Sequence, residues 1–487
     1  MSEKKIIGRK PEIKILKEVF TSSEAEFLAI YGRRRVGKTH LIREYFSEKG
    51  VYFEITGQKD GTKGDQLENF IMKFSEKFHK TLPLRTPSNW KKAFSLLNTQ
   101  IEATDKSKKI IFFLDELPWL ASKRANLLQV IDYFWNAYWS KKSNFILIAC
   151  GSAASWMLDN LINAKGGLYN RLTKVISLRP FNLNDVHKFL KSRGVILNFQ
   201  QILDIYMVFG GIPHYLKQIN KGQSASQIIN KVCFQKEGLL YGEFNRLFKS
   251  LFEHADIHES IVKTIANQRQ GISRENLIKF TKISSGGGLN RRLEELEASD
   301  LIQSYVPLGR KKKDHYYRIC DEYTYFYLKW IEPLRKKGIA GGKAYWKNQA
   351  KTSRVLSWKG YAFESICLKH VDQICTALDL ENIHCNTGSW RFLPKKGEKE
   401  TGTQIDLIFD RDDGVITLCE IKYSEKIFLI DKRCAKQLAN KIDVFEKHFP
   451  TNKQIFFAMI TTKGIKHTIW SEDIVHNEIS LIDLYRY

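Results

Sequence analysis

Features that mark several specialised protein classes are missing from this sequence. No apolar run is long enough to cross a bilayer, and the N-terminal segment Met1–Lys5 lacks the apolar core of a secretory signal. The eight cysteines are scattered singly between Cys150 and Cys434, with neither a Cys-x-x-Cys pair nor a His/Cys group at zinc spacing. No internal repeat or long low-complexity segment occurs. These absences predict a cytoplasmic protein with reduced thiols and no membrane partner.

Acidic residues are also in short supply. The chain has 53 Asp and Glu against 78 Lys and Arg, which gives a formal net charge of +25 and a pI near 9.5. A surface of that sign attracts polyanions, so nucleic acid is the predicted partner, and the charge leaves the choice between DNA and RNA open. Charge alone leaves open a basic cytosolic protein that binds no DNA specifically, and a homo-oligomer stays open as well. With 487 residues, of which 43% are hydrophobic, the chain is expected to form about three globular domains.

The strongest local motif lies near the N-terminus. An apolar run, 27–31, leads into a glycine-containing loop, and a helical segment, 41–46, follows it. In a strand, loop and helix of this kind, backbone N–H groups curl around phosphates, Lys38 reaches the terminal phosphates, and the Thr39 hydroxyl binds magnesium. The sequence therefore predicts a site for ATP with Mg²⁺. The residues expected to bind the nucleotide here are Gly32, Arg33, Arg34, Arg35, Val36, Gly37, Lys38, Thr39 and His40.

Two later apolar segments are predicted to be neighbouring strands of the same sheet. Segment 109–116 ends in Asp115 and Glu116, at the strand end where ligands bind in parallel sheets. Asp115 is expected to complete the magnesium site begun by Thr39, and Glu116 to orient or deprotonate the attacking water. Segment 144–150 is followed by Ser152, whose side chain is predicted to sense the γ-phosphate.

Together these segments resemble the archaeal-type ATPases within the AAA+ and STAND group of P-loop proteins, over roughly the first half of the chain. The resemblance adds Gly8, Arg9 and Pro213 as residues beside the adenine, although a turn and a helix start explain them equally well. It also makes Arg171 an arginine-finger candidate that contacts the nucleotide or a neighbouring subunit. The alternative for Arg171 is a surface arginine in a basic chain.

The middle of the chain shows a helix–helix–helix–hairpin pattern. Ser273 is a predicted N-cap of the second helix, the third has apolar residues from Leu289 to Leu296, and strands 301–306 and 315–319 follow. This pattern resembles a winged-helix domain, in which the third helix enters the major groove and the wing touches phosphate. The alternative is a packing module with a solvated hairpin tip. The DNA-contact candidates are Asn290, Arg291, Arg292, Arg310, Lys311, Lys312 and Lys313.

An aromatic group follows the hairpin, and a linker rich in glycine and lysine, 336–342, follows the aromatic group. We expect the aromatic residues to form a domain-closing core and not a platform on which bases stack. The linker marks the start of a new domain. The aromatic residues are Tyr323, Tyr325, Phe326, Tyr327 and Trp330.

The last segment contains a spaced acidic cluster. A helical pattern, 358–366, precedes two strands, 403–410 and 415–422, which an Asp-Asp-Gly turn joins. Alternation places Asp406 on one face of its strand, and Glu420 and Lys422 on one face of theirs. Two carboxylates and a lysine can therefore converge and hold magnesium against a phosphodiester.

This order of elements resembles the restriction-endonuclease-like superfamily, in particular the nuclease-like domain that often follows archaeal-type ATPases. By that resemblance Glu364 is the helix carboxylate, Asp406 and Glu420 are the metal ligands, and Lys422 is the lysine of the motif. Gln404 supports the site, and the proline that commonly precedes the first aspartate is absent. Two alternatives stay open: a surface ladder of cross-strand salt bridges, and a nuclease fold that has kept the residues but lost the activity.

The sequence thus predicts a multidomain α/β protein. Its parts are a parallel-sheet P-loop ATPase with a helical lid at 1–225, a winged-helix domain at 226–335, and a mixed α/β restriction-endonuclease-like domain at 336–487. We expect an ATPase coupled to a magnesium-dependent DNA nuclease, the coupling being a hypothesis. The alternative is a STAND-like switch that binds ATP as a latch and uses its C-terminal half only to bind a partner or DNA. The catalytic candidates are Lys38, Glu116, Arg171, Glu364, Asp406, Glu420 and Lys422.

Overall fold

The chain folds into two compact units, each with its own sheet and core. The computed structural model describes residues 6–79, 84–122, 124–163, 168–268, 271–283, 286–311, 314–339, 341–342, 344–394 and 402–486. The first unit contains residues 1–180 and 294–300, and the second contains 181–293 and 301–487. Both predicted domain boundaries, after residues 225 and 335, fall inside the second unit. Within the described residues, no helix combines the length and apolar character needed to cross a membrane.

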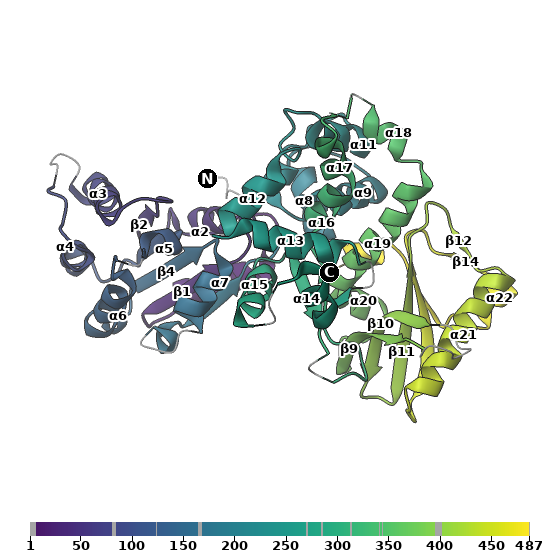
Figure 1. Cartoon of the computed structure of the whole chain (residues 1–487). Coiled ribbons are helices and arrows are strands. Elements are labelled where there is room, and N and C mark those ends of the chain that lie inside the picture. The colour runs from purple at the N-terminus through teal and green to yellow at the C-terminus, as the bar shows by residue number, and fades with distance from the viewer. Residues whose placement is uncertain are drawn as a thin grey trace. The chain divides into compact units, whose positions relative to one another are not determined.

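A five-stranded parallel sheet forms the centre of the first unit. Ala149 pairs with both Ala29 and Leu114, so the carboxyl ends of their three strands meet at one edge of the sheet. Two of these strands are buried along their whole length and the third all but at its last residue, as expected for parallel strands covered by helices. In space the order is β2-β3-β4-β1-β5, where the strands are β1 (Glu26–Tyr31), β2 (Val51–Thr56), β3 (Ile110–Asp115), β4 (Phe145–Gly151) and β5 (Lys174–Ser177). Figure 1 shows β2, β4 and β1 of this sheet.

The strands predicted at 27–31, 109–116 and 144–150 are confirmed to within one residue at each end. An aromatic group, with Phe53 stacked on Phe112 and Phe94 against Trp139, fills one side of the sheet. A rigid core of this kind fixes the strand ends that carry the polar residues. The helices of this unit are α1 (Lys10–Thr21), α2 (Lys38–Phe46), α3 (Lys63–Phe74), α4 (Trp90–Ala103), α5 (Leu117–Leu120), α6 (Leu127–Ala137) and α7 (Ala154–Met157).

The second unit begins with a group of helices. A buried histidine, His370, joins this group to the C-terminal part, because its Nε2 accepts a hydrogen bond from the Leu183 amide at 3.0 Å. The other ring nitrogen, Nδ1, lies 2.8 Å from the Ile366 carbonyl and acts as the donor, so the ring is neutral. The helices of this group are α8 (Leu183–Ser192), α9 (Phe199–Phe209), α10 (Pro213–Leu216), α11 (Ala225–Ile229) and α12 (Glu243–Leu251).

The predicted pattern of three helices and a hairpin is present in the middle of the chain. Ser273 caps the second helix by accepting a hydrogen bond from the Asn276 amide at 3.3 Å, and Leu289 is fully buried on the third. A short strand joins the hairpin in an antiparallel sheet of order β6-β8-β7. The elements are α13 (Ala255–Ala266), β6 (Ile272–Ser273), α14 (Arg274–Thr281), α15 (Gly287–Ala298), β7 (Ile302–Tyr305) and β8 (Tyr316–Ile319).

The aromatic residues after the hairpin are buried, as predicted for a domain-closing core. They lie on and just after α16 (Glu322–Phe326), and Trp330 packs edge-on against Trp346 and Trp358. The hairpin is also fastened to the C-terminal part, since the Leu308 amide donates to the Ser389 carbonyl at 2.8 Å and the Leu308 side chain packs against the C-terminal core. These contacts tie the middle and C-terminal segments into one unit.

The C-terminal part contains a mixed five-stranded sheet of order β15-β13-β11-β10-β9. The predicted pair of strands is antiparallel, as expected, and β11, β13 and β15 run parallel to one another. Helix α21 packs on one face through residues such as Leu438 and Phe445 (Figure 1). The strands are β9 (Cys385–Phe392), β10 (Thr403–Arg411), β11 (Val415–Lys422), β13 (Gln454–Thr461) and β15 (Asn477–Ile479), with β12 (Phe428–Leu429) and β14 (Ile465–Lys466) paired beside them.

A β-bulge breaks the regular alternation of β10 between Ile405 and Ile408. Both residues belong to the core that α21 covers, although residues three apart on a regular strand point to opposite faces. The irregular part of the strand therefore includes Asp406, the residue of β10 that matters for the site. The helices of this part are α17 (Glu332–Lys336), α18 (Tyr345–Gln349), α19 (Ser353–Lys369), α20 (Val371–Ala377), α21 (Lys432–His448) and α22 (Ile469–Glu472).

Candidate functional site

The loop between β1 and α2 has a backbone that only glycine allows at its first position. Gly32 has φ 142°, and a Cβ placed on it would lie 2.3 Å from the Leu178 carbonyl oxygen. Gly37, directly before α2, has φ 99°, and Arg35 also adopts a positive φ of 73°. The loop therefore turns sharply and leaves the first amides of α2 without helical partners, which is the arrangement that binds phosphates.

Lys38 is the first residue of α2, and its side chain contacts the backbone of this loop. Its side chain is 5% exposed, and its Nζ donates to the carbonyl oxygens of Gly32 at 2.8 Å and Arg33 at 3.1 Å. A buried ammonium group needs such acceptors, and phosphate oxygens are stronger acceptors than neutral carbonyls. The lysine is thus held where nucleotide phosphates would replace these two bonds.

Thr39 and Asp115 meet directly, as predicted. The Thr39 hydroxyl lies 3.0 Å and 3.1 Å from the two carboxylate oxygens of Asp115, which ends β3. Burial raises the pKa of Asp115, while hydrogen bonds from Cys150 and Thr39 oppose the shift. A hydroxyl and a carboxylate are the hard oxygen ligands that Mg²⁺ prefers, and a cation would offset the cost of burying this charge. The two residues fit a magnesium ion.

Glu116, the predicted base, and Ser152, the predicted phosphate sensor, are hydrogen-bonded to each other. One Glu116 oxygen, Oε2, accepts hydrogen bonds from the Ser152 hydroxyl at 2.8 Å and from the Ser152 amide at 3.1 Å. Glu116 follows β3 with a left-handed backbone, φ 50°, and Ser152 follows β4. Adjacent strand ends therefore hold the carboxylate in place by two neutral donors.

Arg9 belongs to the loop's surroundings. It is 7% exposed and donates to the Val36 carbonyl at 3.0 Å and to the Arg179 carbonyl at 2.6 Å, while the preceding Gly8 has φ 66°. Arg9 therefore supports the phosphate loop from the side. Of the loop residues, Arg33 and Val36 are buried, Arg34 and Arg35 are half-buried, and the His40 side chain is 64% exposed.

Two of the other predicted nucleotide-side residues have local explanations in the structure. The Arg171 side chain is 40% exposed and its Nε lies 3.9 Å from Asp132 Oδ1, within its own unit. Pro213 is the first residue of α10 in the second unit, where proline suits the start of a helix. Their assignment to the nucleotide stays a prediction.

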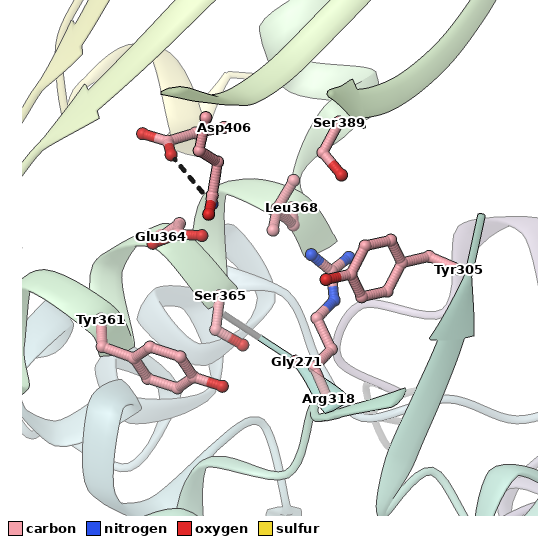
Figure 2. Close-up of a pocket in the computed structure, with 10 residues that line it drawn as sticks. Gly271, Tyr305, Arg318, Tyr361, Glu364, Ser365, Leu368, Ser389 and Asp406 are labelled. Atoms are coloured by element: carbon pink, nitrogen blue, oxygen red, sulfur yellow. Dashed lines mark hydrogen bonds between the residues drawn. The ribbon is translucent and has the colours of Figure 1, made fainter. Parts of the chain in front are cut away.

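In the second unit, Glu364 and Asp406 line one pocket. Glu364 reaches it from α19 and Asp406 from β10, and Gln404 Nε2 lies 3.5 Å from Asp406 Oδ1 (Figure 2). Burial, and then the Asp406 charge, raises the pKa of Glu364 to about 8. Burial, and then the Glu420 charge, raises the pKa of Asp406 to about 6. The carboxylates are close enough to repel each other, which favours a proton or a cation at the site.

Glu420 is engaged differently from the other two carboxylates. Its Oε1 lies 2.5 Å from Lys422 Nζ, and its Oε2 lies 2.6 Å from Lys441 Nζ on α21. Glu420 is only 1% exposed, so these contacts are not a solvated surface ladder. The alternative of a surface salt-bridge ladder is therefore wrong for Glu420. Asp406 is linked to the same strand, because its Oδ2 accepts from the Ile421 amide at 3.1 Å.

The predicted magnesium site in this unit fits only in part. Carboxylate oxygens are suitable ligands, and Mg²⁺ is often held by one or two carboxylates with water. Across the described residues, however, no group of three or more His, Cys, Asp or Glu side chains has a geometry that could hold a metal ion. Asp406 and Glu420 would be the protein ligands, and the Lys441 ammonium group now occupies the Glu420 carboxylate.

Three residues that the sequence did not predict belong to the surroundings of these carboxylates. Lys441 holds Glu420, and Arg318 and Tyr305 of the hairpin line the pocket that contains Glu364 (Figure 2). No local sequence pattern identifies them as site residues, since Lys441 is one of several lysines on α21 and Arg318 lies in an ordinary strand. They are brought to the site by tertiary packing.

The predicted DNA contacts are mostly on the surface. The Asn290 Oδ1 accepts from Arg274 NH2 at 2.9 Å, Arg291 is exposed, and Arg292 is half-buried. Arg310 and Lys311 at the hairpin tip are exposed. The last two candidates, Lys312 and Lys313, lie outside the described residues.

Comparisons with known proteins concern mainly the first part of the chain. Residues 7–219 match the family described as an ATPase domain predominantly from Archaea. The uncharacterized protein MJECL04 of Methanocaldococcus jannaschii is 24% identical over 454 residues, which are 91% of this chain and 94% of that protein. The uncharacterized ATP-binding protein MJ0423 of the same organism is 38% identical over 45 residues, 9% of this chain and 76% of that protein.

Among solved structures, the Walker-type ATPase PABY2304 of Pyrococcus abyssi is similar with a TM-score of 0.46 and 20% identity, covering 66% of this chain and 96% of that one. The Aeropyrum pernix ORC2 protein, in ADPNP and ADP complexes, is similar with a TM-score of 0.42 and 13% identity, covering 72% and 98%. The family match agrees with the site described above, where Lys38 and Thr39 begin α2 and Asp115 and Glu116 lie at the end of β3. Residues 7–219 are therefore an archaeal-type ATPase domain of the P-loop class.

Proposed function

We propose that this protein hydrolyses ATP in its first unit and cleaves DNA in its second. The observation that carries the ATPase proposal is two hydrogen-bonded pairs at the carboxyl edge of the parallel sheet. Thr39 is hydrogen-bonded to Asp115, and Glu116 is hydrogen-bonded to Ser152. One pair is suited to a metal-bound nucleotide and the other holds a carboxylate beside it. The family match of residues 7–219 supports the same assignment.

The proposed ATPase chemistry follows from these positions. Lys38 binds the terminal phosphates, and Mg²⁺ held by Thr39 and Asp115 would neutralise charge on them. Glu116 orients a water and accepts its proton as the water oxygen bonds to the γ-phosphorus. The bond from that phosphorus to the bridging oxygen breaks, which leaves ADP and phosphate.

The test of this half is ATP turnover in Glu116→Gln. Glutamine keeps the size of the side chain and its bond to Ser152 but cannot take a proton, so turnover should fall by about two orders of magnitude or more. ATP should still bind, measured with a fluorescent analogue. A turnover equal to that of the unmodified protein would remove Glu116 from the role of base.

For the second unit we infer a magnesium-dependent DNA nuclease of the restriction-endonuclease-like class. Its support is the position of Glu364 on α19 near Asp406 on β10 and Glu420 on β11, in the order of the predicted motif. Besides burial, the charges of Asp406 and Glu420 both raise the pKa of Glu364, and the charge of Glu420 raises that of Asp406. Water would attack phosphorus as the P–O bond to the leaving sugar oxygen breaks. Lys422 would position the water and offset the negative charge that develops.

The test of this half is cleavage of single-stranded and double-stranded DNA with Mg²⁺ or Mn²⁺, with and without ATP. Glu420→Ala and Lys422→Ala should abolish cleavage, whereas Lys436→Ala, an exposed lysine on α21, should retain it. Each variant should hydrolyse ATP at the unmodified rate, which shows that the chain is folded. An absence of cleavage in every condition, with ATP turnover intact, would reject the nuclease.

One observation favours the second candidate, a STAND-like switch with an inactive nuclease fold. Two ammonium groups hold the Glu420 carboxylate, and a metal ion has to compete with both. In that case ATP would act as a conformational latch and turnover would change little in Glu116→Gln. The same ATPase experiment therefore separates the two candidates.

We further propose that the middle segment is a winged-helix domain that contacts DNA. Its order of elements and the exposed Arg291, Arg310 and Lys311 support this assignment. Contacts to phosphate weaken binding uniformly and reduce its salt dependence when they are removed. The double variant Arg310→Ala/Lys311→Ala should bind DNA more weakly and with a smaller salt dependence, measured by binding titrations at several salt concentrations. An unchanged salt dependence would show that the hairpin tip does not contact DNA.

A further inference from the structure

The pocket with the two carboxylates is built from two different parts of the second unit. Glu364, Tyr361 and Asp406 line it from α19 and β10, and Tyr305 and Arg318 line it from the hairpin (Figure 2). A nuclease domain taken alone, as the sequence predicts it after residue 336, would lack the hairpin side of this pocket.

Strand alternation aims Arg318 at the pocket. Its neighbours Tyr317 and Ile319 on β8 are buried in the hairpin's own core, so Arg318 points to the opposite face of the strand. Its Nε and NH2 donate to Gln303 Oε1 at 3.2 Å and 2.9 Å, and its guanidinium lies 5.0 Å from the centre of the Tyr305 ring. These contacts from β7 hold the guanidinium in one orientation before any ligand arrives.

The charge of Arg318 acts on Glu364, and its guanidinium is held by a neutral group. Arg318 opposes the rise in the pKa of Glu364 that burial and Asp406 cause. In the described part of the chain its hydrogen-bond partner is the neutral amide of Gln303. The ammonium groups of Lys422 and Lys441, by contrast, are taken up by Glu420. Arg318 is therefore a cation of this pocket that is held in place by a neutral group.

We propose that Arg318 binds the phosphodiester of a DNA substrate in this pocket, so that the hairpin and not the nuclease-like domain provides the phosphate-binding cation. The inference rests on the proposed nuclease function. Buried carboxylates repel a phosphate, and a guanidinium offers a planar fork of donors that matches phosphate oxygens. Gln303 and Tyr305 act as positioning residues that orient this fork.

The affinity for Mn²⁺ and the affinity for DNA should change in opposite directions when Arg318 is replaced. Removal of a cation near Glu364 and Asp406 favours the binding of another cation, so Mn²⁺ should bind more tightly. Removal of a phosphate ligand weakens DNA binding. A purely structural role for Arg318 would weaken both together, because a distorted pocket loses its metal ligands as well.

The experiment compares full-length Arg318→Ala and Arg318→Lys with Arg354→Ala. Arg354 is a matched control, since it is an exposed arginine of the same unit whose guanidinium lies 4.5 Å from the centre of the Trp330 ring. Fluorescence anisotropy with short labelled single-stranded and double-stranded DNA in Ca²⁺ gives the affinity for DNA. Electron paramagnetic resonance without nucleotide gives the affinity for Mn²⁺, and DNA cleavage is measured in Mg²⁺.

We expect Arg318→Ala to weaken DNA binding about tenfold, the usual loss for one charge-assisted hydrogen-bonded contact, and to tighten Mn²⁺ binding severalfold. Arg318→Lys should recover part of the DNA affinity, and Arg354→Ala should change neither quantity. DNA affinity and cleavage equal to those of the unmodified chain in Arg318→Ala would overturn the inference, and so would a parallel loss of DNA and Mn²⁺ affinity. If no variant and no unmodified chain cleaves DNA, the nuclease proposal fails, while an Arg318-dependent loss of DNA binding would still support the phosphate contact.

Discussion

The carboxylates Asp115 and Glu116 of the first candidate site and Glu420 of the second are held by different kinds of donor. In the first unit, Asp115 is bonded to the Thr39 hydroxyl and Glu116 to Ser152, so neutral groups satisfy both. In the second unit, Glu420 is bonded to two lysine ammonium groups. A neutral donor leaves the negative charge for a metal ion or a proton, whereas an ammonium group already cancels it. The first site can therefore take up a metal ion directly, whereas at Glu420 a metal ion has to displace a lysine ammonium group.

The largest expected effect tests whether the two sites are separate. Asp115→Asn should lower ATP turnover by about two to three orders of magnitude. Asparagine would hold Mg²⁺ less tightly, so the negative charge that develops on the γ-phosphate would no longer be neutralised. Asp406→Asn should lower DNA cleavage to a similar extent. Each variant is measured in both assays, and each should keep the activity of the other site within about twofold. Loss of both activities in either variant would break the comparison.

A second prediction concerns the stability of the two units in mild acid. Burial lowers the pKa of His370 to about 4 from an ordinary value of 6.5, so between these values the unfolded chain binds a proton that the folded chain does not. The second unit should lose about 3 kcal/mol of stability from this group as the pH falls from 6.5 to 4. His370→Gln lacks that loss.

The measurement is urea unfolding of both proteins from pH 7.5 to pH 4. Other titrating groups are common to the two proteins and cancel in the difference between their free energies of unfolding. The advantage of the unmodified chain over His370→Gln should be largest above pH 6.5 and should shrink steadily below it. A difference that stays constant with pH would show that the ring titrates normally in the folded state.

The third prediction sharpens the contrast in donors. Lys441→Met removes one of the two ammonium groups from Glu420 and keeps a long apolar side chain, so Mn²⁺ affinity in the second unit should rise about tenfold. Lys436→Met is the control, because that lysine on the same helix is exposed. Metal binding is followed by calorimetry without nucleotide. An equal affinity in the two variants would mean that Lys441 does not compete with the metal.

The smallest expected effect concerns the neutral donors of the first unit. Ser152→Ala removes the hydroxyl from Glu116 but leaves the backbone amide bond at 3.1 Å. The loss of one neutral hydrogen bond is worth about 1 kcal/mol, so ATP turnover should fall about fivefold. Steady-state kinetics at saturating ATP measures the change. A fall as large as that in Glu116→Gln would show that the hydroxyl does more than hold the base.

The first site was largely predictable because its signals are local. A loop of eight residues, a strand that ends in two carboxylates and a strand that ends before Ser152 each carry their own evidence. The parallel sheet then brings them together by a general rule. What the sequence did not predict is the bond between Glu116 and Ser152, because two side chains at neighbouring strand ends have several partners within reach.

The second site was predictable in its strands and, by resemblance, in the helix carboxylate Glu364, which lines the pocket with Asp406. Alternation placed Glu420 and Lys422 on one face of β11, as found, but no residue pattern predicts the bulge in β10 beside Asp406. Lys441 and Arg318 come from a helix and a hairpin whose packing on the sheet depends on the whole core. Long-range packing of this kind selects one lysine or arginine among many in a basic chain.

The docking of the hairpin by Leu308 onto the C-terminal core bears on how freely this protein's parts could have been exchanged during evolution. A gene fusion or deletion cut at the glycine- and lysine-rich linker would separate the C-terminal part from Leu308 and expose the apolar residues that Leu308 covers. It would also remove Arg318 from the pocket. The C-terminal part is therefore expected to be inherited together with the hairpin, and a shuffled copy without the hairpin would tend to aggregate.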